Sequence, residues 1–284
     1  MFSCVRFHVR QVGLIIFALT AYSALAQQTP AVSKTVALGT LPKRFVTDEW
    51  HLWTSPFRSS PQRSHTLKKY GIPFALVSAA LIATDRQTGK ILPNTLDQTI
   101  WSGRISQLGA AYTLAGISGG TYLLGRFAGN DHFKETGVLG LEALAHTQIA
   151  TLAFKQATNR QRPVDGEGKG SFWKGGTSFP SGHAASSFAV ATVFAYEYRD
   201  HLAVPITAYS LAALVSASRI GAQRHWLSDI SVGGSLGFLI GRFTYKRNHN
   251  PNLPGATGNR VAMFVPDLAI RDRGVLLTWH VAGN

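Results

Sequence analysis

The chain is poor in cysteine and in charged side chains. Its one cysteine is Cys4, and charged residues make up 15% of the 284 residues, against 45% hydrophobic residues. Such a composition is typical of a folded chain with a large core. Because Cys4 lies at the very start, the body of the chain has no thiol for cysteine catalysis, disulfide crosslinks or thiolate metal sites.

Long uninterrupted apolar runs are also lacking. The apolar stretches stay below the roughly 20 residues that a helix needs to cross a bilayer, and Arg126, Glu142 and His146 interrupt them. The mean hydropathy of +0.05 is low for a chain immersed in lipid. We therefore expect a compact helical bundle, and association with a membrane stays open. Glu142 and His146, one turn apart, are expected to pair with each other.

Positive charge is in excess, and the formal net charge is +14. This balance favours anionic partners such as phosphorylated substrates, anionic lipid or nucleic acid. The basic residues are dispersed along the sequence, which contains no finger, basic-zipper or RNA-binding motif. Nucleic acid is therefore not expected as a partner.

The N-terminus has the layout of a secretory signal peptide. Arg6 and Arg10 precede the apolar residues 12–21, and Ala24 and Ala26 supply the small residues that a signal peptidase recognises. We expect residues 1–26 to be removed and the protein to be secreted, into the periplasm if the source is a bacterium. A retained membrane anchor is the alternative.

The rest of the chain divides into three parts by composition. Residues 27–66 are polar and are expected to form an irregular arm that Trp50, Trp53 and Phe57 dock onto the body. Residues 67–248 are expected to form the helical domain, and residues 249–284 a tail with two β-type runs around RDRG. The predicted fold is mainly α, a bundle of about six core helices with a short C-terminal β-hairpin-like tail. The expected helices are 72–84, 100–127, 133–158, 183–198, 204–219 and 225–246.

The first of three stretches suited to binding an anion is KQATNRQRP, residues 155–163. Lys155 lies near the end of an expected helix. Pro163 disfavours helix at Arg162 and places it in an extended turn. Taken alone, basic residues at a helix end more often only complement the helix dipole.

The second stretch is PSGH, residues 180–183. Ser181 is a typical helix N-cap, and Gly182 allows an oxyanion to approach the main-chain N–H groups of the first turn. His183 is expected to point from the first turn toward the same anion. A capped helix with an incidental histidine is the alternative interpretation.

The third stretch is SRIGAQRHWLSD, residues 218–229. Arg219 ends one expected helix and His225 opens the next, so Asp229, four residues on, shares its face. A carboxylate there accepts the proton of one ring nitrogen and leaves the other nucleophilic. A solvated pair or two metal ligands are the alternatives, but the sequence has no HExxH cluster, and the glycine-rich residues 164–176 lack calcium-loop spacing. No metal and no cofactor is expected.

The order K-x6-RP, PSGH and SR-x5-H-x3-D resembles the type 2 phosphatidic acid phosphatase superfamily, over about residues 72–246. The resemblance implies a helical bundle and a metal-independent phosphatase that hydrolyses phosphomonoesters or lipid phosphates through a phosphohistidine. In this reading His225 is the nucleophile, Asp229 orients it, and His183 protonates the leaving oxygen. The implied phosphate-binding residues are Lys155, Arg162, Ser181, Gly182 and Arg219.

Two other functions stay open. Vanadium-dependent haloperoxidases resemble the same motifs, so an oxidoreductase is one alternative, because a shared scaffold can support different chemistry. A non-enzymatic protein that binds phosphate or a membrane surface is the other, although binding alone needs no oriented nucleophile such as His225. Both soluble and lipid phosphates are candidate substrates.

Overall fold

The computed structural model describes residues 41–54, 65–91, 95–165, 168–251, 253, 267–271 and 274–278. The expected signal peptide, residues 1–26, lies outside these residues. Within them the chain is mainly helical, which confirms the predicted fold class. The helices are α2 (Leu41–Thr54), α4 (Ile72–Ile91), α5 (Leu96–Ser106), α6 (Ala111–Phe127), α7 (Asp131–Thr158), α8 (Gly182–Glu197), α9 (Ala203–Gly221) and α10 (Leu227–Asn248), with a π-helical turn η3 (Leu67–Gly71) and a 3-10 turn η4 (Gln107–Gly109).

One expected helix is divided in the structure. Residues 100–127 form α5 and α6, with η4 between them. Gly109 explains the break, because it lies against α8 and α9: a Cβ there would come within 2.3 Å of Val215 Cγ1 and 2.4 Å of Ser187 Oγ. The chain therefore turns where it touches two other helices closely.

Helix α8 is the centre of the bundle and is buried along most of its length. Its partner α10 contacts it through glycines spaced four residues apart. A Cβ at Gly237 would lie 1.9 Å from the Ala185 carbonyl oxygen, and one at Gly241 would lie 2.4 Å from that of Ala189. Because the two backbones pack this closely, their N-terminal ends are held side by side. Those ends carry the second and third sequence motifs.

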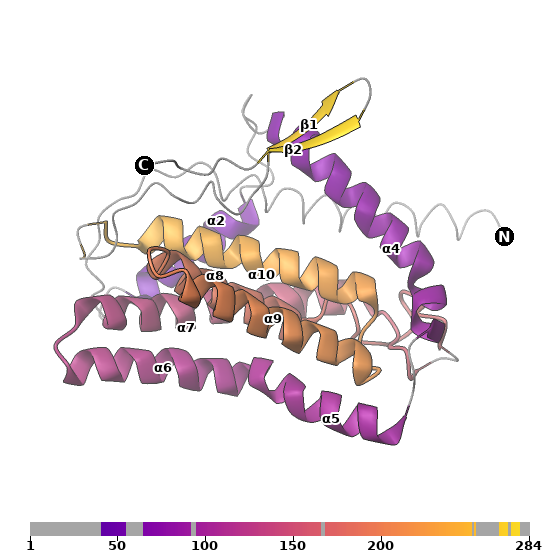
Figure 1. The fold of residues 1–284 in the computed structure, drawn as a ribbon, viewed down its shortest axis with the longest axis horizontal. Coiled ribbons are helices and arrows are strands. Elements are labelled where there is room, and N and C mark those ends of the chain that lie inside the picture. The colour runs from indigo at the N-terminus through magenta and orange to yellow at the C-terminus, as the bar shows by residue number, and fades with distance from the viewer. Residues whose placement is uncertain are drawn as a thin grey trace.

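The helices run so that one end of the bundle collects all three motifs. The C-terminal ends of α7 and α9 and the N-terminal ends of α8 and α10 lie at this end (Figure 1). Helix α4 crosses the bundle obliquely and packs against α10 (Figure 1).

The expectation of an irregular arm is wrong for residues 41–54, which form α2. Trp50 does not dock it, because its side chain is 64% exposed. The docking contacts are polar: Arg44 Nε donates to Glu142 Oε1 at 2.9 Å, and Asn248 Nδ2 donates to Asp48 Oδ2 at 2.7 Å. Leu52 is fully buried beside them. Arg44, Asp48 and Leu52 are four residues apart, so the helix places all three on the face that contacts the body.

The pairing expected between Glu142 and His146 is also replaced by contacts with α2. Glu142 pairs with Arg44, and His146 Nδ1 lies 2.6 Å from Glu49 Oε1. Both residues are buried in α7, where each needs a partner of its own. Helix α2 supplies those partners.

A second buried ion cluster holds the opposite end of the bundle together. His249 Nδ1 lies 2.8 Å from Glu135 Oε1 and 3.4 Å from Glu197 Oε1. Burial lowers the pKa of His249, but the contacts with Glu135 and Glu197 outweigh it and raise the pKa to about 9. The imidazolium therefore links α7, α8 and the chain after α10.

The tail contains two paired strands. Strand β1 (Asp267–Arg271) runs antiparallel to β2 (Gly274–Thr278), with Ala269 opposite Leu276.

Candidate active site

The N-termini of α8 and α10 meet directly at the site. Ser181, the N-cap of α8, donates its main-chain N–H to the Asp229 carbonyl oxygen at 3.0 Å. Its side chain accepts from the Ala184 N–H at 3.5 Å, as expected of a cap. A Cβ at Gly233 would lie 2.5 Å from the Ser181 carbonyl oxygen, so this glycine allows the contact.

His225 lies just before α10, which begins at Leu227, and its side chain is buried. Its Nδ1 lies 2.7 Å from the Ser178 carbonyl oxygen. Since a carbonyl only accepts, Nδ1 carries the proton and Nε2 is left without one. Burial lowers the pKa of His225, which keeps the imidazole neutral despite the nearby Asp229.

Asp229 does not orient His225 in the manner expected. Its Oδ2 lies 3.6 Å from His225 Nδ1, beyond hydrogen-bonding distance, and His225 precedes the helix instead of sharing its face. Asp229 accepts instead from the Trp226 N–H at 2.8 Å and the Ser178 hydroxyl at 2.5 Å. Ser178 therefore contacts both groups, through its carbonyl to His225 and through its hydroxyl to Asp229.

Arg160 is the main charged partner of Asp229, and no sequence argument had singled it out. Its NH1 donates to Asp229 Oδ1 at 2.6 Å, and its NH2 donates to Asp85 Oδ2 at 2.7 Å. Burial alone would raise the pKa of Asp229, but interactions with His225, Arg160 and Ser178 hold it below its usual range. The carboxylate is therefore negatively charged.

Asp85 was missed because it lies in α4, outside all three motifs. It accepts from the Ser228 N–H at 3.1 Å at the start of α10 and is 2% exposed. The sequence signal that could have identified Asp85 is an acidic residue within a largely apolar helix, since acidic side chains are rarely buried without a partner. Arg160 lies among the unspecified positions of KQATNRQRP, where the pattern gives it no role.

The three expected phosphate-binding cations lie around the start of α8. Lys155 Nζ donates to the Thr177 carbonyl at 3.0 Å, and Arg162 NH2 donates to Thr177 Oγ1 at 2.9 Å. Arg219 NH1 donates to Ser106 Oγ at 2.8 Å. Each side chain is thus held at one point and keeps further N–H donors for an anion.

These cations lower one another's pKa values. Burial and the charge of Arg162 lower the pKa of Lys155 to about 8, with a smaller effect of Arg219. Burial and Arg162 likewise lower the pKa of Arg219 to about 10. Positive charge concentrated in this way favours a multiply charged anion.

Gly182 and His183 face the same cations. A Cβ on Gly182 would lie 3.9 Å from Lys155 Cε and 4.0 Å from its Nζ, so the first residue of α8 presents bare backbone to the ammonium group. Burial, followed by Arg219 and His225, lowers the pKa of His183 to about 4. His183 is therefore neutral, and a bound anion would raise its pKa.

The structure thus brings all the predicted site residues to one end of the bundle, and Asp229 contacts His225 less directly than expected. Residues 137–252 match the profile of the PAP2 superfamily. These residues belong to the PAP2 superfamily. The three motifs fall inside the PAP2 segment, whereas Asp85 and α4 lie outside it.

Two curated proteins resemble the chain over parts of their length. A lipid A 1-phosphatase of Porphyromonas gingivalis is 41% identical over 69 residues, which cover 24% of this chain and 16% of the relative. A PA-phosphatase related-family protein of Dictyostelium discoideum is 31% identical over 140 residues, 43% of this chain and 52% of the relative. The chain therefore spans about half or less of these relatives.

One solved structure is also similar, a transmembrane PAP2 type phosphatidylglycerolphosphate phosphatase from Bacillus subtilis. It shares 22% sequence identity, with a TM-score of 0.45, over 72% of this chain and 92% of that one.

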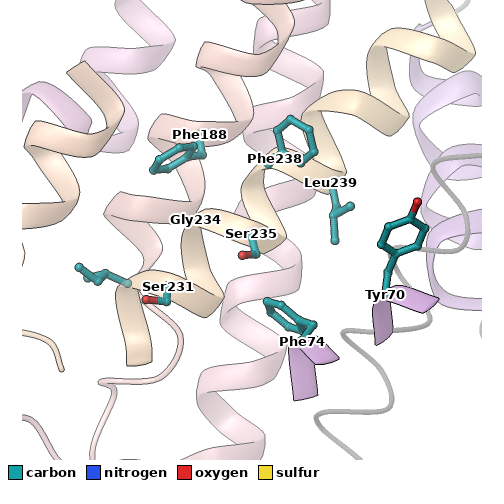
Figure 2. Close-up of a pocket in the computed structure, with 9 residues that line it drawn as sticks. Tyr70, Phe74, Phe188, Ser231, Gly234, Ser235, Phe238 and Leu239 are labelled. Carbon is teal, nitrogen blue, oxygen red and sulfur yellow. The ribbon is translucent and has the colours of Figure 1, made fainter. Parts of the chain in front are cut away.

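Two apolar grooves lie between helices of the PAP2 segment and helices that precede it in the chain. One, of about 540 Å³, lies between the start of α4 and the α8–α10 pair, where Phe74 faces Phe188 and Phe238 (Figure 2). The other, of about 510 Å³, lies between α6, α8 and α9. Ser187 and Val215 line this second groove, one helical turn from His183 and Arg219 respectively. It therefore begins beside the cationic site.

Proposed function

We propose that the protein is a phosphatase that uses His225 as its nucleophile and needs no metal ion. The observation that carries this proposal is the hydrogen bond from His225 Nδ1 to the Ser178 carbonyl. It leaves Nε2 unprotonated, in a ring whose pKa the nearby Lys155 and Arg219 lower in addition to burial. Nucleophile, phosphate site and acid together are what phosphoryl transfer requires.

In the first step His225 Nε2 attacks phosphorus and the bond from phosphorus to the ester oxygen breaks. His183, whose pKa the bound phosphate has raised, gives its proton to the leaving oxygen. Lys155, Arg162 and Arg219 neutralise the phosphate oxygens, and the main-chain N–H groups at Gly182 add donors at the helix N-terminus.

In the second step water attacks the phosphoryl group held by His225. His183, now neutral, accepts the proton of that water as the N–P bond breaks. Inorganic phosphate leaves, and His225 returns to the neutral tautomer fixed by the Ser178 carbonyl. The residues recover their starting protonation states, so the cycle closes.

We propose a lipid phosphate as the substrate. The groove between α6, α8 and α9 begins one turn from His183, and its lining is almost entirely apolar. An acyl chain in this groove would leave its phosphate among the cations. The P. gingivalis relative, named a lipid A 1-phosphatase, supports the same class of substrate.

We further propose that the protein works at a membrane surface outside the cytoplasm. Among the described residues, α9 alone is long and apolar enough to cross a bilayer, by length and composition. Apolar side chains are exposed on the helices that border the groove, so contact with lipid would cover them. They include Tyr112, Leu123, Leu124, Ile206 and Leu214.

Hydrolysis of p-nitrophenyl phosphate in excess EDTA tests the reaction. We expect turnover to survive chelation and vanadate to inhibit it. Loss of turnover with EDTA, restored by a divalent metal, would contradict the metal-free mechanism. Bromide oxidation after vanadate loading would favour the haloperoxidase alternative.

Two tryptophan variants test the lipid groove. Ala208 lines it, whereas Ala213 lies on an exposed face of the same helix. We expect Ala208→Trp to lower kcat/KM for a long-chain lipid phosphate about tenfold or more and to leave p-nitrophenyl phosphate hydrolysis near wild type, because filled volume excludes the chain alone. Ala213→Trp is the matched control and should change neither rate. Equal loss on both substrates would count against the groove.

A further inference from the structure

We propose that Asp85 is a positioning residue for this reaction, and this inference rests on the proposed function. Asp85 neutralises the guanidinium of Arg160, so that the negative charge of Asp229 remains available to stabilise His225 when its ring becomes positive. The inference concerns a residue of α4, which the three motifs and the PAP2 segment do not include.

Arg160 lies between two carboxylates in a closed environment. It is 1% exposed, and its two terminal nitrogens bond Asp85 on one side and Asp229 on the other. Its NH1 also donates to Ser228 Oγ at 2.7 Å, and its Nε donates to the Gly170 carbonyl at 3.2 Å. The centroid of the Phe172 ring lies 4.7 Å from the guanidinium carbon, so the ring excludes water on that face. Arg160 is therefore held rigidly in a region of low dielectric.

The summed charge of Asp85, Arg160 and Asp229 sets the electrostatic potential at His225. With Asp85, Arg160 and Asp229 all ionised, the group carries one net negative charge. Without the charge of Asp85, Arg160 and Asp229 form a neutral pair. Asp229 Oδ2 lies 3.6 Å from His225 Nδ1, so the remaining negative charge lies beside the imidazole.

His225 needs that charge only while the phosphoryl group is attached. In the resting site its imidazole is neutral. When Nε2 bonds to phosphorus, Nδ1 keeps the proton that it donates to the Ser178 carbonyl, so the ring becomes cationic. A buried cation without a counter-charge is costly, so the counter-charge stabilises the phosphoenzyme and the transition state that leads to it.

Asp85 also has a structural contact, and the experiment must separate the two roles. Its Oδ1 accepts the Ser228 N–H at the start of α10, where helix N–H groups have no partner within the helix. Asparagine at position 85 keeps an oxygen for this N–H. Its amide group replaces Oδ2, which accepts from Arg160 NH2 and from the Ser228 hydroxyl, so an acceptor is lost together with the charge. Asp85→Asn is therefore compared with a double variant that also removes the guanidinium, and with Asp85→Glu, which keeps the carboxylate.

The experiment measures the rate of phosphoenzyme formation in single turnovers of p-nitrophenyl phosphate by the full-length protein. We expect Asp85→Asn to slow formation about tenfold or more with little change in KM, because the charge acts on the transition state. The double variant Asp85→Asn/Arg160→Gln restores one net negative charge, and we expect it to react faster than Asp85→Asn. Asp85→Glu, which keeps the charge, should retain most of the rate. Exposed Asp131, at the far end of α7, provides the control Asp131→Asn, expected at the wild-type rate.

If Asp85 had a purely structural role, the double variant would react more slowly than Asp85→Asn, because the loss of two partners destabilises the fold more than the loss of one. A double variant as slow as Asp85→Asn or slower, or an Asp85→Asn protein at the wild-type rate, would overturn the proposal.

If Asp85→Asn does not fold, the double variant decides alone. It should fold and react within about tenfold of wild type, since no unpaired guanidinium is buried in it, and a rate as low as that of His225→Ala would overturn the proposal. Absence of any phosphoenzyme in the wild-type protein would instead contradict the proposed function itself.

Discussion

The imidazole of His225 donates its Nδ1 proton to the main-chain carbonyl of Ser178, at 2.7 Å. A main-chain group thereby sets the tautomer of the proposed nucleophile, and no side-chain substitution removes the acceptor. Asp229, at 3.6 Å, is left to act mainly through its charge. This division of roles underlies the first prediction.

Substitution of His225 and substitution of His183 are expected to affect different steps of the reaction. His225→Ala should abolish p-nitrophenyl phosphate hydrolysis and the acid-labile phosphoenzyme, because it removes the unprotonated Nε2 that is proposed to attack phosphorus. His183→Ala should still form the phosphoenzyme from p-nitrophenyl phosphate, whose leaving group needs little protonation, and then hydrolyse it slowly. Acid-quench trapping of labelled phosphate measures both steps. Label found on His183 in the wild-type protein would reverse the two roles.

Two glycine substitutions should have different effects. Gly182→Ala places its methyl group 3.9 Å from Lys155 Cε, an ordinary contact, so the fold should persist while the methyl occupies space that the phosphate needs. We expect kcat/KM to fall about tenfold or more with Tm nearly unchanged. Gly237→Ala would place its methyl group 1.9 Å from the Ala185 carbonyl oxygen, which forces α8 and α10 apart. Thermal unfolding should show a clear loss of stability in this second variant only.

Substrate capture should weaken in alkaline solution. The pKa of Lys155 is lowered to about 8 by burial and by Arg162, so Lys155 is charged below pH 8 and loses its proton as the pH rises through that value. We expect kcat/KM, which reports ionisations of the free enzyme, to fall through the same range. Lys155→Arg should remove this limb of the pH profile, because a guanidinium keeps its proton. A limb that persists unchanged in Lys155→Arg would assign it to another group.

Stability should also depend on pH at the opposite end of the bundle. His249 has an ordinary value of 6.5 in the unfolded chain and a pKa raised to about 9 in the fold by Glu135 and Glu197, against the effect of burial. Its contribution to stability is therefore complete below pH 6.5 and is lost as the pH rises through 9. Measured from pH 6 to 10, the Tm difference between wild type and His249→Gln should shrink. A difference that stays constant with pH would contradict an imidazolium between the two glutamates.

Local sequence patterns were sufficient for most of the core helices and for the three motifs. Ser181 caps α8 because a hydroxyl can accept an N–H of the first turn, which depends on neighbouring residues alone. The helices at 133–158 and 204–219 follow from apolar residues without alternation. The arm was mispredicted because α2 is stabilised by distant residues such as Glu142 and Asn248, and no local pattern reports such partners.

The sequence by itself predicted that a lysine, two arginines, a glycine at a helix start and two histidines serve one anion site, because helix starts and ends are encoded locally. Only the tertiary structure decided how His225 is held. Ser178, Arg160 and Asp85 come from separate parts of the chain, and they converge because glycines in α10 let it pack against the backbone of α8 while α4 crosses its start. Buried charges and carbonyls must find partners wherever the fold places them, and those partners are chosen by packing in space.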